Sequence, residues 1–283
     1  MPNQIVAVVC FVVAALAAGC AVNPVTGQEE LMFFSPEEDV NLGRKYAPQI
    51  EKALKGRFDD ENLQNYVNRV GQRIARVCHR PDLAYHFAAV EEPSENALAV
   101  PGGYIYITRG LLEQLESEAQ LAAVLAHEVG HVVARDTMAA ISRQFGMAAL
   151  VAAAHVSGAP SDVARASSFI TAVLSLQYSR EDERDADLTG LSYMVQAGYD
   201  PQGMVETMQI LQNLQAIRPV EFFSTHPNPE SRIAYLRERI ERRYASLGTL
   251  KEGRQEYEEA VLSRLKQGKK PGGAHVSDRS YGK

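Results

Sequence analysis

The motif H-E-V-G-H at residues 127–131 constrains the fold of this 283-residue chain more than any other feature of its sequence. Ser117 and Gln120 have the spacing of a helix-capping box, and apolar residues recur at helical spacing over residues 121–132. Two residues four apart on a helix differ by about 40° around the axis and about 6 Å along it, so the two histidines share one face. The chain must therefore fold so that another segment reaches this face of a helix.

These residue types in this spacing are typical of a zinc site. Zinc accepts neutral imidazole nitrogens, here from His127 and His131, and in catalytic sites it keeps a position for water, whose pKa it lowers to about 7. Glu128 points to one side of the helix, where it could act as the general base that passes the proton of this water to a leaving amine. The plainer alternative is two surface histidines on an amphipathic helix, but a chance match on a predicted helix is rare.

A third ligand is expected from the helix that Ser179 caps, because its start carries five carboxylates: Glu181, Asp182, Glu183, Asp185 and Asp187. Acidic residues in a first turn commonly compensate the helix dipole, which accounts for the first two. Glu183 and Asp187 share one face with the apolar Leu191, and a carboxylate on a buried face is costly unless it binds something. We therefore expect Glu183 to be the third metal ligand and Asp187 to accept the free ring N–H of a ligand histidine.

The rest of the pattern predicts an α+β fold that is mainly helical. Helices are expected over residues 36–54, 61–77, 117–132, 179–198 and 200–217, and again after residue 228. Residues 84–108 hold short β-rich runs broken by turn residues, which predict two or three strands of a small antiparallel or mixed sheet. Residues 138–177 are rich in alanine and weakly periodic. Their apolar run at 145–156 is too short to span a bilayer, and could form a core helix, a lid or a surface that dips into a membrane.

The first twenty residues have the pattern of an export signal. The apolar run at residues 5–18 suits a secretory signal and is short for a membrane span. The small residues before Cys20 resemble the site at which bacterial lipoproteins are cleaved, so that Cys20 would carry lipid. Two features depart from the usual pattern, since residues 1–4 contain no Lys or Arg and Ala17 stands where Leu is usual. An ordinary signal peptide or a short membrane anchor is the alternative.

Together the motifs resemble peptidase family M48, a family of zinc metallopeptidases. The resemblance covers about residues 30–245 and rests on Asn96-Ala97, Pro101-Gly102-Gly103, the H-E-x-x-H motif, Ser179-Arg180-x-x-Glu183-x-x-Ala186-Asp187, and His226-Pro227 with Arg232. It implies a gluzincin-like fold with one zinc ion per chain, endopeptidase activity, and a sheet whose edge strand aligns the substrate. Asn96, Gly102 and Gly103 would belong to this substrate edge, with a purely structural turn as the alternative.

The resemblance also gives His226 a place near the zinc, although a histidine before a proline in a loop is most often an ordinary surface residue. His226 could donate a hydrogen bond to the oxyanion that forms during hydrolysis, with Arg232 supporting it. It could instead occupy the water position as a fourth ligand and keep the enzyme latent. The sequence leaves both roles open.

These features divide the chain into a signal peptide at residues 1–19, a lipid-anchored tether at 20–34, a peptidase domain at 35–266 and a disordered polar tail at 267–283. The net charge of −6 and the scattered Lys and Arg residues indicate no nucleic-acid partner. Only Cys78 lies beyond the first twenty residues, so no internal disulfide is expected.

The branch of the family that this chain resembles is the exported, lipoprotein-type branch, which acts in envelope protein quality control. We therefore expect an outer-membrane lipoprotein on the periplasmic face, held by the lipid on Cys20, that cuts unfolded or misassembled envelope proteins bound as an added strand. The main alternative is a zinc-stabilised, chaperone-like factor that assists outer-membrane protein assembly with little proteolysis. A zinc hydrolase with another substrate class is a third reading. The intact Glu128 argues against a purely structural metal site, which has no need of this carboxylate.

Overall fold

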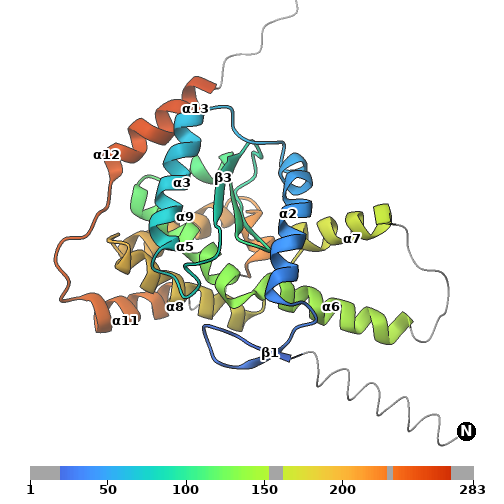
Figure 1. The fold of residues 1–283 in the computed structure, drawn as a ribbon. Coiled ribbons are helices and arrows are strands. Elements are labelled where there is room, and N and C mark those ends of the chain that lie inside the picture. The colour runs from blue at the N-terminus through green and yellow to red at the C-terminus, as the bar shows by residue number, and fades with distance from the viewer. Residues whose placement is uncertain (1–19, 153–161, 228–231, 269–283) are drawn as a thin grey trace, which may run out of the picture.

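The computed structural model describes residues 20–152, 162–227 and 232–268 (Figure 1). The chain begins with β1 (Cys20–Val22), β2 (Glu29–Leu31), α2 (Pro36–Ala53) and α3 (Glu61–Ala75). It continues with β3 (His86–Val90), β4 (Ala97–Val100), β5 (Tyr104–Thr108), α4 (Arg109–Leu112), α5 (Glu118–Ala134), α6 (Asp136–Ala152), α7 (Asp162–Leu174) and α8 (Arg180–Gln196). It ends with α9 (Gln202–Gln215), α10 (Phe222–Thr225), α11 (Arg232–Tyr244), α12 (Arg254–Tyr257), the π-helical turn η1 (Glu258–Leu262) and α13 (Ser263–Gly268).

The sheet has three strands in the order β3-β5-β4, with β3 parallel and β4 antiparallel to β5. Ile105 and Ile107 of β5 pack with α3 and α5 on one face, whereas Tyr106 packs with α2 on the other. Because both faces are covered, the strands are apolar along most of their length, with His86 and Thr108 at strand ends as the polar exceptions. The small mixed sheet in a mainly helical domain confirms the predicted fold class.

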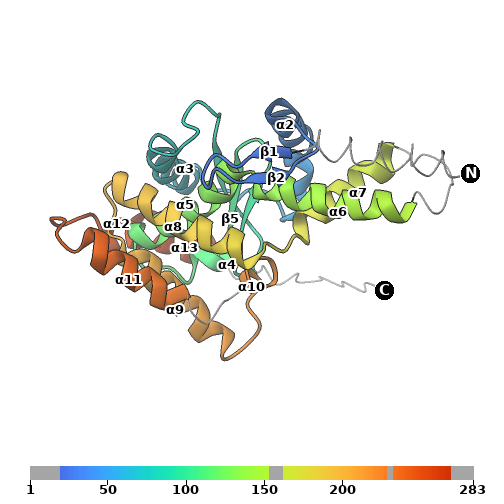
Figure 2. The ribbon, with the colours of Figure 1, turned by 90° about the horizontal axis from the view of Figure 1, so that it is seen from below.

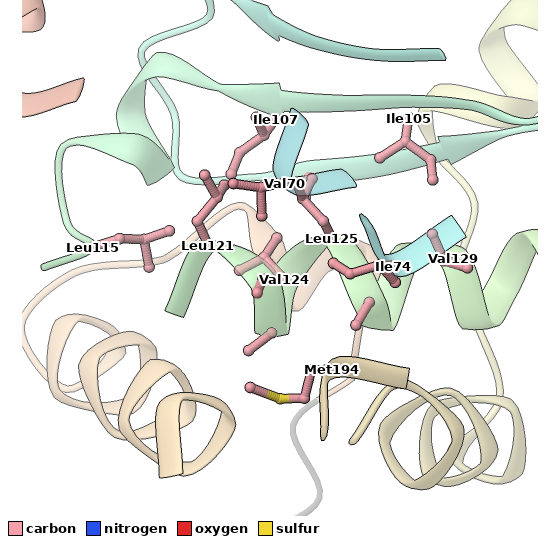
Figure 3. Packing of buried hydrophobic residues seen from close by; sticks show 14 of the residues in the cluster. Val70, Ile74, Ile105, Ile107, Leu115, Leu121, Val124, Leu125, Val129 and Met194 are labelled. Carbon is pink, nitrogen blue, oxygen red and sulfur yellow. The ribbon is translucent and has the colours of Figure 1, made fainter. Parts of the chain in front are cut away.

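Helix α5 is the centre of the fold, and every one of its residues is buried. Figure 3 shows Leu121 and Leu125 pointing from α5 toward the sheet, with Met194 of α8 on the opposite side of the helix. Each fully buried aliphatic side chain of this kind stabilises the fold by about 1.5–3 kcal/mol. The helix begins where the sequence predicts, since the Ser117 hydroxyl accepts a hydrogen bond from the Gln120 amide.

Helices α5 and α8 cross closely because glycine occupies both sides of the crossing. A Cβ atom on Gly190 of α8 would lie 2.9 Å from the Ala126 carbonyl and from the His127 nitrogen of α5. A Cβ atom on Gly130 of α5 would likewise lie 3.0 Å from the Cα of Ala186. This close approach brings the carboxylates of α8 next to the histidines of α5.

Residues 20–31 form a β-hairpin within the segment 20–34, where the sequence analysis predicts a tether. Strands β1 and β2 pair in antiparallel fashion from Cys20 with Leu31 to Val22 with Glu29. Met32 is buried in the cluster that includes α2 and α6, and the Phe33 amide donates a hydrogen bond to Ser142 Oγ at 3.1 Å. These contacts hold the end of the hairpin against α2 and α6. The predicted signal peptide and residues 269–283 of the predicted tail lie outside the described residues.

Helices α6 and α7 extend from the body side by side (Figures 1 and 2). Their inner ends pack on α2 through Met138 and Ile141 of α6 and Phe169 and Val173 of α7. The apolar run at 145–156 falls on the outer part of α6 and beyond the described residues, so its role stays a prediction. No helix in the described ranges has both the length and the apolar character that crossing a bilayer requires.

Candidate active site

Four potential metal ligands from three parts of the chain meet beside the α5–α8 crossing. His127 and His131 come from α5, Glu183 comes from α8, and His226 directly follows α10. One ligand atom from each residue lies within 4.8 Å of the ligand atoms of the other three. All four residues are buried, with at most 3% of their surface exposed.

The distances between these donor atoms fit a tetrahedral zinc ion. His127 Nε2 lies 3.1 Å from His131 Nε2 and 3.6 Å from Glu183 Oε2, and His131 Nε2 lies 3.5 Å from Glu183 Oε1. Donors placed about 2.1 Å from a tetrahedral zinc ion are about 3.4 Å apart. Two imidazoles and one carboxylate are also a donor set that catalytic zinc sites use. The residues of this chain therefore fit the ion.

His226 stands where a fourth donor would lie. Its Nδ1 atom is 3.3 Å from His127 Nε2 and 2.8 Å from Glu183 Oε1. Its Nε2 atom is 3.5 Å from Glu128 Oε1, so the ring lies between the other ligands and the expected general base. The ring stacks on Phe222, with centroids 4.3 Å apart. Of the two roles that the sequence analysis leaves open, this position fits the fourth ligand.

Glu128 is fully buried, and neither carboxylate oxygen has a hydrogen-bond partner of ordinary geometry among the described residues. It lies beside the backbone amide of Ala99 in the edge strand β4. Burial raises the pKa of Glu128, so this carboxylate takes up a proton more readily than an exposed one. A buried carboxylate with such weak partners is costly for the stability of the fold.

Asp187 lies where the sequence analysis places it, with Oδ1 3.0 Å from His127 Nδ1. Arg232, which we expect to support His226, lies instead against two carboxylates. Its Nη2 is 2.6 Å from Asp187 Oδ1, and its Nη1 is 2.7 Å from Glu183 Oε2. Burial alone would raise the pKa of Asp187, but Arg232 holds it well below its usual range. Arg232 therefore helps to keep Asp187 ionised and orients both carboxylates, whereas the pKa of Glu183, which burial alone would raise, is held low mainly by His226 and His131.

Three further side chains belong to the site, and the sequence analysis missed them. Asp136 Oδ2 lies 2.7 Å from His131 Nδ1, and the ring of Tyr178 stacks on His131 with centroids 3.8 Å apart. The Tyr235 hydroxyl donates a hydrogen bond to Asp187. The sequence could have indicated Asp136, because a carboxylate just past the end of the histidine helix can reach back to a histidine on it. No sequence pattern indicates the two tyrosines.

The residues predicted for the substrate edge lie at the two ends of β4. Asn96 Oδ1 accepts a hydrogen bond from the Thr225 hydroxyl at 3.5 Å, which joins the start of β4 to the segment that carries His226. Gly102 and Gly103 form the turn after β4, with φ values of 77° and 91°. A Cβ atom on Gly103 would lie 2.5 Å from the Ala84 carbonyl oxygen. The turn alone accounts for both glycines, and their contact with substrate stays a prediction.

Two histidines and a glutamate on neighbouring helices, beside a small sheet whose edge strand β4 pairs with β5 alone among the described strands, are the arrangement of a zinc metallopeptidase. Residues 61–240 match the family model of peptidase family M48. This match covers more than half of the chain, so the chain belongs to that family.

Known relatives agree with this assignment. The chain is 28% identical over 213 residues to the beta-barrel assembly-enhancing protease of Escherichia coli, an alignment that covers 71% of this chain and 44% of that protein. It is 32% identical over 213 residues to the mitochondrial metalloendopeptidase OMA1 of Schizosaccharomyces pombe, covering 71% of this chain and 62% of that one. The OMA1 of Arabidopsis thaliana is 31% identical over 206 residues, with 73% and 41% covered. The matched part is less than two thirds of each relative's length.

Proposed function

We propose that this chain is a zinc-dependent endopeptidase of the bacterial cell envelope that hydrolyses misfolded or stalled envelope proteins. The observation that carries the proposal is Glu128, a buried carboxylate beside four potential ligands that makes no hydrogen bond of ordinary geometry with any described residue. A purely structural metal site would not need it. The similarity to an assembly-enhancing protease and to metalloendopeptidases supports a peptide substrate over another substrate class.

His127, His131 and Glu183 would hold the ion. Zinc bound there would supply a water that is ionised near neutral pH. Glu128 would take the proton and deliver it to the leaving amine, a task that its raised pKa suits. Asp187 fixes the ring of His127, and Asp136 fixes the ring of His131 in the same way.

The substrate would bind as an extended strand along β4. This strand lies at one edge of the described sheet, and no other described strand pairs with its outer side. The backbone of Ala99 in this strand faces the site, since its carbonyl accepts a hydrogen bond from Thr137 and its amide lies beside Glu128. A peptide added to this edge would therefore run directly past the general base.

The described conformation is a latent one, in our proposal, because His226 occupies the fourth position and the ligands are closed off from solvent. Activation then requires His226 to withdraw. Three donors would remain in place, which leaves a position open for water.

The test compares the full-length wild type with Glu128→Gln and His226→Ala, using cleavage of an unfolded model protein and the zinc content of each preparation. We expect all three to contain zinc, Glu128→Gln to be inert, and His226→Ala to cut faster than the wild type. Loss of activity in His226→Ala would instead assign this residue to the oxyanion. If all three bind zinc and none cuts, the peptidase proposal fails and the chaperone-like assembly factor becomes the better proposal.

We further propose that Cys20 carries lipid and holds the domain on the periplasmic face of the outer membrane. The apolar run before Cys20 supports this, as does the exposed position of Cys20 in strand β1. Mass spectrometry of the mature N-terminus tests it, and an unmodified Cys20 or a terminus elsewhere would contradict it.

A further inference from the structure

A basic groove of about 480 Å³ lies between α8 and α11. Its lining residues are Arg184, Leu188, Tyr235, Glu238, Arg239, Arg242 and Arg243. Four arginines and one glutamate leave three positive charges here, in a chain whose net charge is −6. The groove is therefore positively charged although the net charge of the chain is negative.

Most of this charge is not neutralised from within the described residues. Glu238 pairs with Arg242 at 2.8 Å, and both side chains are largely exposed. Arg184 lies over the ring of Tyr235, 4.5 Å from its centroid, which holds the guanidinium at the wall of the groove. No described carboxylate forms a salt bridge with Arg184, Arg239 or Arg243. Guanidinium groups arranged in this way bind the oxygens of phosphate groups well.

A second, independent feature points to a lipid as the source of the phosphate. Cys20 is exposed and lies within strand β1, paired with Leu31, so a lipid on Cys20 would hold the folded domain directly against the bilayer with no tether between. Val22 and Phe33, on and beside the same hairpin, are 61% and 42% exposed and are among the few large apolar side chains left open to solvent. Apolar side chains in this position suit the membrane interface.

The hairpin and the two helices that line the groove lie on the same side of the molecule. Figure 1 places β1, α8 and α11 along its lower side, and Figure 2 views the molecule from that side. Carboxylates near the hairpin are compensated only in part. Glu30 accepts a hydrogen bond from Asn23 and Asp182 pairs with Arg143, but burial and the neighbouring Asp182, Glu30 and Glu181 raise the pKa of Asp185.

We propose that this side seats on an anionic membrane, with lipid phosphate groups in the α8–α11 groove and with Val22 and Phe33 in the interface. The proposal rests on the lipid anchor proposed for Cys20 and does not depend on peptidase activity. The Tyr235 hydroxyl, at the wall of the groove, donates a hydrogen bond to Asp187, which in turn contacts His127. The membrane contact would thus lie just behind the metal site.

The experiment uses the full-length lipidated chain on phosphatidylcholine vesicles with and without phosphatidylglycerol, and a quencher attached to the lipid headgroups. A fluorophore is placed on Glu241→Cys, an exposed position of α11, or on Lys55→Cys, in the loop after α2 at the other end of the molecule. We expect several-fold stronger quenching at position 241 than at position 55, and a further increase with phosphatidylglycerol.

Charge variants are then compared in the protein labelled at position 241. Arg239→Ala with Arg243→Ala should abolish the increase that phosphatidylglycerol causes. Lys55→Ala with Arg57→Ala removes the same charge from the opposite end and should leave the increase intact, which controls for net charge.

Equal quenching at the two labelled positions would overturn the proposal, and so would an unchanged phosphatidylglycerol effect in the groove variant. Inorganic phosphate alone could also change the fluorescence at position 241 while the vesicles quench both positions equally. That result would show a site for free anions and would also overturn the proposal. A chain that does not sediment with vesicles would refute the lipid anchor and this proposal together, while leaving the peptidase proposal to its own test.

Discussion

The crossing of α5 and α8 sets the geometry of the metal site, and Gly190→Ala tests this directly. The new Cβ would lie 2.9 Å from the carbon and oxygen of the Ala126 carbonyl and from the His127 nitrogen. Ordinary contacts between such atoms are about 3.5 Å or longer, so α8 must shift by roughly 0.6 Å at this point. The shift acts on the two helices that supply His127, His131 and Glu183.

The expected change in stability is modest, because two effects oppose each other. Overpacking of this kind costs about 1–3 kcal/mol, whereas alanine is the better helix former by about 0.5–1 kcal/mol. Metal affinity is the more sensitive quantity, since ligand distances in metal sites are held to within about 0.2 Å. We expect Gly190→Ala to bind zinc about 10–100-fold more weakly, the range seen when the support of metal ligands is disturbed.

The assay is competition for zinc against a chromophoric chelator, together with urea unfolding of the zinc-free protein. Gly203→Ala is the matched control, because its Cβ would lie 2.7 Å from the carbonyl carbon of Ala119, at the first turn of the same helix α5. That position is about 12 Å along the helix from His127. We expect Gly203→Ala to lose stability but to keep its zinc affinity. Wild-type zinc affinity in Gly190→Ala, or an equal loss in both variants, would refute the argument.

Three further predictions concern stability. Chelation should lower the unfolding temperature, because zinc at a thousandfold excess over its Kd contributes about 4 kcal/mol, and an unchanged midpoint would contradict a folded-state metal site. Asp39→Ala leaves the buried Arg135 without its carboxylate and should cost about 3–5 kcal/mol in urea unfolding, so a loss below about 1 kcal/mol would count against this pair. Burial alone would raise the pKa of Glu118, but hydrogen bonds from Lys251 and Tyr66 lower it. The stability that ionised Glu118 provides is therefore present above its unfolded pKa of about 4.3 and lost as the pH falls below it, so the deficit of Glu118→Gln should shrink in acid; a constant deficit would contradict this.

Several elements could be predicted because their signals are local. The start of α5 follows from Ser117 and Gln120, three residues apart, and the strands follow from short β-rich runs between turn residues. Glu183 and Asp187 could be singled out among five carboxylates because they share a helical face with Leu191, and all three are buried. In each case the residues that carry the signal lie within a few turns of one another.

Other features depend on partners that are distant in the chain. Arg232 lies 45 residues beyond Asp187, and nothing in its neighbourhood indicates that it would be buried between carboxylates. In the sequence, Gly130 and Gly190 look like ordinary small residues. Only the crossing of α5 and α8 in the structure shows that each glycine faces the backbone of the other helix. The hairpin at residues 20–31 was missed because its turn is as typical of a linker as of a strand pair, and its burial depends on α2 and α6.

The sequence pattern around His226 does not decide between its two possible roles. An oxyanion donor and a fourth ligand need the same residue in nearly the same place, and they differ only in which way the ring nitrogens point. In the structure Nδ1 faces Glu183 and Nε2 faces Glu128, so the ring fills the space between the ligands and the base. The His226 amide also donates a hydrogen bond to the Phe222 carbonyl at 2.8 Å, so the backbone of His226 is tied to the short helix α10. We therefore expect a contact that shifts α10 to move His226 with it and to open the site without disturbing the three remaining ligands.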